Sequence, residues 1–319
     1  MKLLVLGAGG IGGYYGGRLA QADAAAVTFL VRPKRREQIE SEGLRIESPL
    51  GDARIDARTV LAEDLRPGYD LVLFTCKAYD LDSAMDAIAP AMNGTCAVVP
   101  MLNGIAHLEK LAGRFGKGSV MGGTAQINVT LRGDGVVHHM DKLGRIVFGE
   151  LDRSASARPK ALADAFAKSQ VDWKLSPDIE LEMWEKIVFL CSLASATCLF
   201  RANVGEIVAA PGGAAAMQRA LDANVEIATR EGHAPRPGAI EFARTRLTDP
   251  AGTWSASMLR DLESGGQVEG DHIVGWMLDK ARKHGVDDTI LSLAYTHLKA
   301  YEARKAAGRL PDLAPYQAR

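Results

Sequence analysis

The pattern of apolar positions divides the chain into an alternating first half and a helical second half. Short apolar runs predict strands at residues 2–6, 27–31, 71–75, 95–100, 120–125 and 145–149. Helical periodicity falls between them, near 11–21, 80–89, 105–114 and 159–169. Several strand runs are apolar at every position, which is typical of parallel strands that helices cover on both faces. This alternation predicts an α/β domain with a mainly parallel sheet.

Residues 44–60 carry a different pattern. Leu44–Glu47 and Ala53–Asp56 alternate apolar and polar side chains around a turn signal that contains Pro49 and Gly51. Alternation on both sides of a turn predicts a short antiparallel pair of strands.

After residue 176 only helical periodicity remains. Ser176, Pro177 and Asp178 offer a capping hydroxyl, a proline for the first helical position and an acid for the first turn. Long helical patterns follow at 178–199, 213–231, 235–247, 269–283 and 290–306. We therefore expect an N-terminal Rossmann-type domain at residues 1–176 and an all-α C-terminal domain at 177–319, with the cleft between them as the default active site.

The first turn of the chain carries the clearest functional signal. The strand run 2–6 leads directly into the segment Gly7-Ala8-Gly9-Gly10-Ile11-Gly12, and a helix is expected after it. In a dinucleotide-binding unit, Gly7 permits the tight turn and Gly9 lets the backbone approach a pyrophosphate, while Gly12 allows close packing of the helix. The helix N-terminus then directs its N–H groups at the anion.

The end of the second predicted strand indicates which dinucleotide binds. NAD sites usually have an acid there for the ribose 2′-hydroxyl, but here Arg32 follows the strand and no carboxylate occurs before Glu37. Three more cations follow closely: Lys34, Arg35 and Arg36. A guanidinium can grip a 2′-phosphate with a fork of donors, so we predict NADP(H) with Arg32 as its phosphate ligand. The alternative is that these cations are the solvated start of a helix.

Polar residues follow two other strands at the same edge of the predicted sheet. Lys77 comes after the strand at 71–75, and Asn103 comes after the strand at 95–100. In a doubly wound order both overlook the crevice in which a dinucleotide lies. The alternatives are a solvated loop cation for Lys77 and a turn residue before Gly104 for Asn103.

Lys186 precedes a run, Ile187–Cys191, that is apolar all round. Such a helix is buried, and a buried ammonium is costly unless it is paired or used. Burial also lowers the pKa of a lysine toward the range of a useful proton donor. The alternative is a surface ion pair with Glu182, four residues earlier.

Two further sites lie at expected helix starts. Glu269 and Asp271 open one helical pattern, where first-turn acids also complement the helix dipole; for Asp271 that is the preferred interpretation. Ser257 lies at another start, where capping is the commonest role of a hydroxyl. His138 and His139 have no ligand spacing to other residues, so no chemistry and no metal is assigned to them.

The composition narrows the class of protein. The 319 residues carry a net charge of −1 with the basic residues spread along the chain, which does not favour a nucleic-acid or membrane partner. No apolar run is expected to reach the length of a membrane span, and the first strand reads as structure rather than as a leader. The four cysteines lie in apolar surroundings, as expected for reduced thiols in a cytoplasmic protein.

These segments, in this order, resemble the ketopantoate (2-dehydropantoate) reductase family, NADPH-dependent enzymes of pantothenate synthesis, over nearly the whole chain. The matching pieces are Gly7-x-Gly9-x-x-Gly12, Arg32, Thr75-x-Lys77-Ala78, Asn103-Gly104, Met121-Gly122-x-Thr124, Trp184-x-Lys186, Ser257-Met258-Leu259 with Asp261, and Glu269-x-Asp271-x-x-x-Gly275.

The resemblance implies a role for each site residue. Lys186 would be the general acid in reduction of a 2-oxo acid, and Glu269 would orient it or bond the substrate hydroxyl. Asn103 and Ser257 would hold substrate polar groups, with Asn103 also near the nicotinamide, and Lys77 would fix the cofactor. Relatives are often dimers, which leaves a homodimer open as an assembly.

The chain departs from the family pattern at three positions where amides are expected: Leu190, Ala194 and Trp254. An apolar wall leaves a substrate hydroxyl unpaired at a cost of about 1–3 kcal/mol. The departures therefore favour a substrate more apolar than ketopantoate, unless Ser192 and Ser195 restore polarity.

Two other functions remain as alternatives. One is a dehydrogenase of the β-hydroxyacid or 6-phosphogluconate type, which also pairs a Rossmann domain with helices and a lysine. The other is a non-catalytic NADPH-binding sensor.

Overall fold

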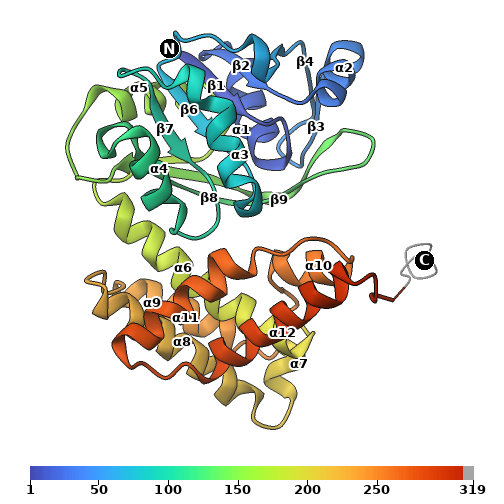
Figure 1. The fold of residues 1–319 in the computed structure, drawn as a ribbon, viewed down its shortest axis with the longest axis vertical. Helices are drawn as coiled ribbons and strands as arrows, with labels where there is room; N and C mark the ends of the chain where they lie inside the picture. The colour runs from blue at the N-terminus through green and yellow to red at the C-terminus, as the bar shows by residue number, and fades with distance from the viewer. Residues whose placement is uncertain (312–319) are drawn as a thin grey trace. The chain divides into compact units, whose positions relative to one another are not determined.

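A computed structural model describes residues 1–311 of the chain (Figure 1). It divides the chain into two compact units, Met1–Met183 and a second that begins at Trp184. In Figure 1 the first unit runs from blue to yellow-green and the second from yellow to red. Each unit is described by itself below.

The first unit contains a five-stranded parallel sheet, sheet A, in the order β5-β2-β1-β6-β7. Its strands are β1 (Lys2–Leu6), β2 (Ala26–Leu30), β5 (Arg58–Val60), β6 (Leu71–Phe74) and β7 (Ala97–Pro100). Its helices are α1 (Gly10–Gln21), α2 (Pro33–Glu42), α3 (Leu81–Ile88), α4 (His107–Phe115) and α5 (Ala157–Phe166). The predicted Rossmann-type alternation is confirmed, and β1 lies at the centre because it is apolar on both faces.

A second sheet, sheet B, belongs to the same unit and has the order β10-β9-β3-β4, with β8 paired to β9. Its strands are β3 (Leu44–Glu47), β4 (Ala53–Ile55), β8 (Met121–Leu131), β9 (Val137–Glu150) and β10 (Trp173–Leu175). The antiparallel β3–β4 pair was expected and is confirmed. The runs at 120–125 and 145–149 pair with each other at the open end of a longer antiparallel hairpin, β8–β9, in sheet B rather than in the parallel sheet.

Helix α1 lies between the two sheets because its glycines let both backbones approach. A side chain at Gly16 would meet Phe29 and Val5 of sheet A at 2.8 Å. A side chain at Gly13 would meet Val137 at 2.6 Å, and one at Gly17 would meet Ile46 at 2.7 Å, both in sheet B. The glycines on the two faces of α1 therefore determine how closely this helix packs against sheet A and sheet B.

The second unit is helical, as predicted, and no strand occurs among residues 184–311. Its elements are the end of α6 (Ile179–Phe200), α7 (Val204–Ala209), α8 (Gly213–Arg230), α9 (Pro237–Leu247), α10 (Ser257–Glu263), a π-helical turn (Asp271–Gly275), α11 (Trp276–His284) and α12 (Thr289–Ala306). The short helix α7 and the π turn were not predicted.

The two compact units divide inside α6, between Met183 and Trp184, and the domain boundary expected from the sequence, at 176/177, lies just before this helix. The first residues of α6 belong to the sheet unit because Ile179 packs against Gly122 of β8 and Gly149 of β9. The helix also begins later than predicted: Ser176 Oγ accepts a hydrogen bond from the Asp178 N–H at 3.2 Å, and Pro177 lies in the turn before Ile179.

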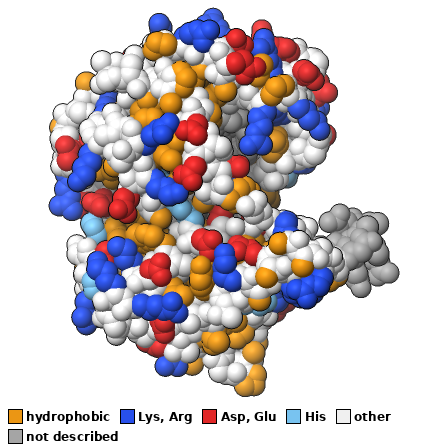
Figure 2. Space-filling view, viewed as in Figure 1, with side chains coloured by type: hydrophobic (Ala, Val, Ile, Leu, Met, Phe, Trp, Pro, Cys, Tyr) orange, Lys and Arg blue, Asp and Glu red, His pale blue; other side chains and the backbone are white. Residues whose placement is uncertain are grey.

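Helix α6 is long and apolar enough to cross a membrane by length and composition, which contradicts the expectation that no run reaches that length. However, 67% of its most apolar stretch is buried inside the structure. Most of the apolar surface of this helix is therefore buried against other parts of the protein. Figure 2 shows Lys, Arg, Asp and Glu side chains interspersed over the visible face of the molecule.

The glycine rows of α1 lead to a stability test. We expect Gly16→Ala to lower the free energy of unfolding by about 1–3 kcal/mol, since the added methyl group overpacks the contact with Phe29. Gly113→Ala in α4 is the matched control, because nothing lies within 4 Å of the added atom. That control should be neutral or stabilising by about 0.4–1 kcal/mol. Urea denaturation measures both, and equal effects of the two changes would contradict the packing argument.

Candidate active site

The glycine-rich turn between β1 and α1 has the geometry of an anion-binding turn. Gly7 has a φ of +87°, which favours glycine, and its N–H donates to the Leu30 carbonyl oxygen at 2.9 Å. A side chain at Gly12 would clash with the Gly7 carbonyl and the Thr75 hydroxyl. Gly9 precedes the first turn of α1, and a side chain there would meet nothing within 4 Å. The turn therefore has both the tight backbone and the open space that a pyrophosphate requires.

Arg32 lies just outside the helix that follows β2. It is the N-cap residue of α2, in extended conformation, and its side chain is 85% exposed. The nearest acid is Asp80, with 3.9 Å between the guanidinium and the carboxylate. A helix does begin here, as the alternative interpretation supposes, but Arg32 precedes it and keeps an accessible guanidinium.

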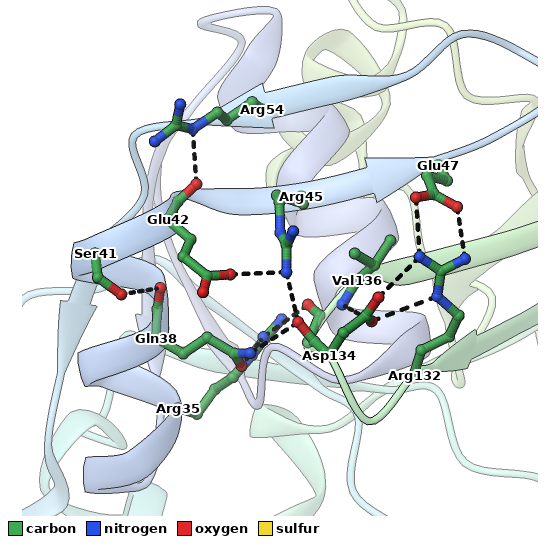
Figure 3. A network of polar contacts seen from close by, with 11 residues as sticks. Arg35, Gln38, Ser41, Glu42, Arg45, Glu47, Arg54, Arg132, Asp134 and Val136 are labelled. Atoms are coloured by element: carbon green, nitrogen blue, oxygen red, sulfur yellow. Dashed lines mark hydrogen bonds and ion pairs between the residues drawn. The ribbon is translucent and has the colours of Figure 1, made fainter.

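Arg35, by contrast, is occupied within the protein. Its Nε donates to the Ala8 carbonyl at 3.1 Å, and its Nη1 donates to the Gly135 carbonyl at 2.8 Å. Figure 3 shows it in a network that joins α2 to the β8–β9 hairpin through Asp134. Arg35 thus stabilises the glycine turn through its bond to the Ala8 carbonyl. Arg36 forms an ion pair with Glu40 at 2.7 Å. Arg32, Arg35 and Arg36 therefore differ in exposure and in partners, which their spacing in the sequence does not reveal.

Lys77 and Asn103 follow β6 and β7, the two strands on one side of β1 in sheet A. Lys77 comes after β6, is exposed, and is the N-cap of a 3₁₀ turn, Ala78–Asp80. Asn103 comes after β7, is half-buried, and precedes Gly104, whose φ is +86°. Because β1, β6 and β7 are parallel neighbours, both residues lie at the carboxyl edge that also holds the glycine turn.

Lys186, in the helical unit, has a pKa below the usual range of a lysine. It lies on α6 and is half-buried, and its loss of hydration lowers its pKa to about 8. The carboxylate of Glu269 opposes that shift, which requires the two groups to be close enough to interact. Glu182, the alternative partner, accepts a hydrogen bond from Lys174 at 2.6 Å. The amine is therefore partly dehydrated near a specific acid, as a general acid requires.

Glu269 is 7% exposed and lies just before the π turn, Asp271–Gly275. Asp271 is not merely a first-turn acid: it accepts hydrogen bonds from Tyr295 Oη at 2.8 Å and from Lys299 Nζ at 3.0 Å. The two acids of this motif thus differ, since one is buried and the other is held by α12.

Ser257 is the first residue of α10 and Ala256 is the N-cap, so the alternative interpretation of Ser257 as the cap is wrong. Its side chain makes no capping hydrogen bond, and the residue is half-buried. A hydroxyl that does not cap its own helix remains suited to a ligand.

The three residues that depart from the family pattern do not supply the missing amides. Leu190 is half-buried one turn after Lys186, and Ala194 is fully buried. The indole of Trp254 donates to the Arg246 carbonyl at 3.1 Å, and the Arg246 guanidinium lies 4.9 Å from its ring centre.

The two serines that were left open as a source of polarity, Ser192 and Ser195, are fully buried. Ser192 Oγ donates to the Val188 carbonyl at 2.7 Å and accepts from Asn224 Nδ2 at 3.0 Å. Ser195 lies 3.7 Å from the Cys191 sulfur. Both hydroxyls therefore serve the helical core.

Within residues 1–311, no group of His, Cys, Asp and Glu has the arrangement of a metal site. His139 makes hydrogen bonds with Ser48 Oγ at 2.8 Å and with the Leu143 carbonyl at 2.9 Å, so its role is structural.

Comparison with known proteins identifies the class. The family model for ketopantoate reductase PanE/ApbA matches residues 3–153, and the model for its C-terminal part matches 178–302. A Bacillus subtilis protein named uncharacterized oxidoreductase YkpB is 35% identical over 96% of this chain and 100% of its own length. The 2-dehydropantoate 2-reductase of Halobacterium salinarum is 27% identical over 90% of this chain and 94% of its own.

Among solved structures, 2-dehydropantoate 2-reductase from Geobacter metallireducens is similar with a TM-score of 0.84 and 26% identity. The similarity covers 94% of this chain and 99% of that one.

Fold, glycine turn and these similarities define a Rossmann-type, NADP-dependent oxidoreductase. The chain belongs to the ketopantoate reductase family, and the resemblance found in its sequence is confirmed. Members of the family act on small-molecule keto acids, and the family belongs to pantothenate biosynthesis.

Proposed function

We propose that the protein reduces a 2-oxo acid to the 2-hydroxy acid, with Lys186 as the general acid. The observation that carries this proposal is the lowered pKa of Lys186, about 8, next to the buried Glu269. NADPH, when bound, supplies the hydride that reaches the carbonyl carbon. The carbonyl oxygen takes the proton from Lys186 Nζ, and Glu269 stabilises and orients the ammonium before transfer.

Cofactor binding is assigned to the edge of sheet A. Residues Gly7 to Gly12 provide the N–H groups and open backbone for the pyrophosphate, and Arg32 provides the accessible cation for a 2′-phosphate. Lys77 and Asn103, at the same edge, are assigned to cofactor contacts, with Asn103 also serving the substrate. Ser257 is assigned to a substrate polar group because its hydroxyl does not cap α10.

The substrate is proposed to be more apolar than ketopantoate. Leu190 and Ala194 follow Lys186 by one and two turns of α6, and neither carries a hydrogen-bonding group. The buried Ser192 and Ser195 are engaged in the core and do not replace the missing amides. A hydroxyl on the substrate would then lose its partners, whereas an alkyl or aryl group would not.

The proposed location is the cytoplasm. All four cysteines are free thiols, three of them fully buried, which fits a reducing compartment.

Replacing Lys186 tests the mechanism. We expect Lys186→Ala to lower kcat by roughly 10²–10⁴, the usual contribution of a positioned general acid, with NADPH affinity nearly unchanged. In the wild type, kcat for reduction should fall as the pH rises through about 8, because the donor must be protonated. Steady-state turnover and fluorescence titration measure these effects. Lys168→Ala, at an exposed lysine, is the control, and near-full turnover of Lys186→Ala would rule out the role.

Replacing Arg32 tests the cofactor assignment. Arg32→Ala should weaken NADPH binding much more than NADH binding, since only NADPH has the 2′-phosphate. Lys34→Ala, which removes another exposed cation nearby, should have a smaller effect. Equal losses for the two cofactors in Arg32→Ala would contradict phosphate recognition.

Restoring amides tests the substrate preference. Leu190→Asn with Ala194→Asn should raise kcat/KM for ketopantoate relative to 2-oxo acids that lack a hydroxyl. Because Ala194 is fully buried, Leu190→Asn is measured alone as well, with Leu190→Ala as the control that removes bulk without adding an amide. No gain in a folded variant that carries an asparagine would mean that these positions do not choose the substrate.

A panel of 2-oxo acids separates the proposal from the non-catalytic alternative. NADPH binding without turnover on any member of the panel would favour a sensor.

A further inference from the structure

The turn that follows Glu269 is wound as a π-helix, from Asp271 to Gly275. π turns are rare and often occur at functional sites, since they change the direction of the residues beside them. The Ile273 N–H donates to the Glu269 carbonyl at 3.1 Å, so the turn is bonded directly to that residue. On the other side, the Ile273 carbonyl lies 3.9 Å from the Cys191 sulfur of α6, which acts as donor. The π turn thus links Glu269 to the helix that carries Lys186.

One side chain of α12 contacts both ends of this turn. At the start, Tyr295 Oη donates to Asp271 Oδ1 at 2.8 Å, and Lys299 Nζ reinforces the contact at 3.0 Å. At the end, a side chain on Gly275 would meet the Tyr295 ring at 2.8 Å, so the ring fills the space that glycine leaves. Leu298 packs against Gly270 in the same way, at 3.4 Å from the position of an added Cβ.

We propose that Tyr295 is a positioning residue, which holds the π turn at Asp271 and Gly275 and thereby fixes Glu269 relative to Lys186. The proposal rests on the proposed function. A π turn holds one residue more than a turn of α-helix. If it relaxed to an α-helix, that residue would shift into the preceding segment and rotate it about the helix axis by about 100°. Glu269 would then leave its buried position. The spacing of the motif Glu269-x-Asp271-x-x-x-Gly275 then has one explanation: Asp271 and Gly275 hold the turn that positions Glu269.

The competing interpretation is that Tyr295 only stabilises α12. A stabilising residue changes the free energy of unfolding but leaves the pKa of Lys186 unchanged. A positioning residue changes that pKa, because the Glu269 charge raises it. Two further acids lie near Lys186 along α6, and each has a cation: Glu182 has Lys174 and Glu185 has Arg236. Their charges are not expected to change when the π turn moves.

The experiment measures kcat for reduction against pH in the full-length enzyme with NADPH. Glu269→Gln sets the scale: removal of the charge should move the alkaline limb to lower pH by about one unit. Tyr295→Phe removes only the hydroxyl, and Gly275→Ala forces the ring and the turn apart; both should move the limb in the same direction by part of that amount. Gly238→Ala in α9, where an added side chain meets nothing within 4 Å, is the matched control and should move nothing.

Two results would overturn the proposal. One is an unshifted limb in folded Tyr295→Phe and Gly275→Ala, even if their melting temperatures fall. The other is an equal shift in Gly238→Ala. If the wild type reduces no 2-oxo acid, the proposed function fails instead. In that case, the pH dependence of Lys186 reductive methylation, followed by mass spectrometry in the same variants, still measures the effect of Tyr295 on the amine.

Discussion

The partial dehydration of one ammonium group is the constraint on which the helical unit depends. An amine in apolar surroundings loses its hydration and gives up its proton more easily, and here the pKa of Lys186 falls to about 8. Without an acid nearby, the pKa of the amine would be lower still, so the amine would lose its proton at a lower pH and could not donate it above that pH. The Glu269 carboxylate opposes this fall, so its position affects the pKa of the amine.

The sheet unit obeys a different constraint, the close approach of backbones. Helix α1 carries glycines on two faces, so it packs between sheet A and sheet B with little space on either side. The same run of glycines forms the turn at Gly7 and leaves open space over Gly9. Helix packing and the proposed anion site therefore share one segment. Arg35 extends this support by bonding the Ala8 carbonyl, whereas Arg32 stays exposed.

Most of the fold followed from local pattern, and the failures have physical causes. The type of β1 was clear because a short apolar run leads into a glycine turn, and the type of α6 was clear because its apolar run is too long for a strand. The compact units divide inside α6, after Met183, because the packing of Ile179 on Gly122 and Gly149 joins residues far apart in the chain. The π turn was missed because its winding depends on Tyr295 and Leu298, which pack against it from α12. A capping role stayed open as the alternative for Ser257 because the start of a helix cannot be located to one residue from sequence.

The amino-acid sequence by itself determined the class of fold, the glycine turn, the cation after β2 and the lysine in an apolar helix, because each is a feature of neighbouring residues. It also revealed the apolar replacements at Leu190 and Ala194. Only the tertiary structure decided which arginine of the 32–36 segment is accessible, which serine hydroxyls are engaged in the core, and which acid acts on Lys186. Those outcomes depend on solvent exposure and on partners distant in the chain, and neither is encoded in local spacing.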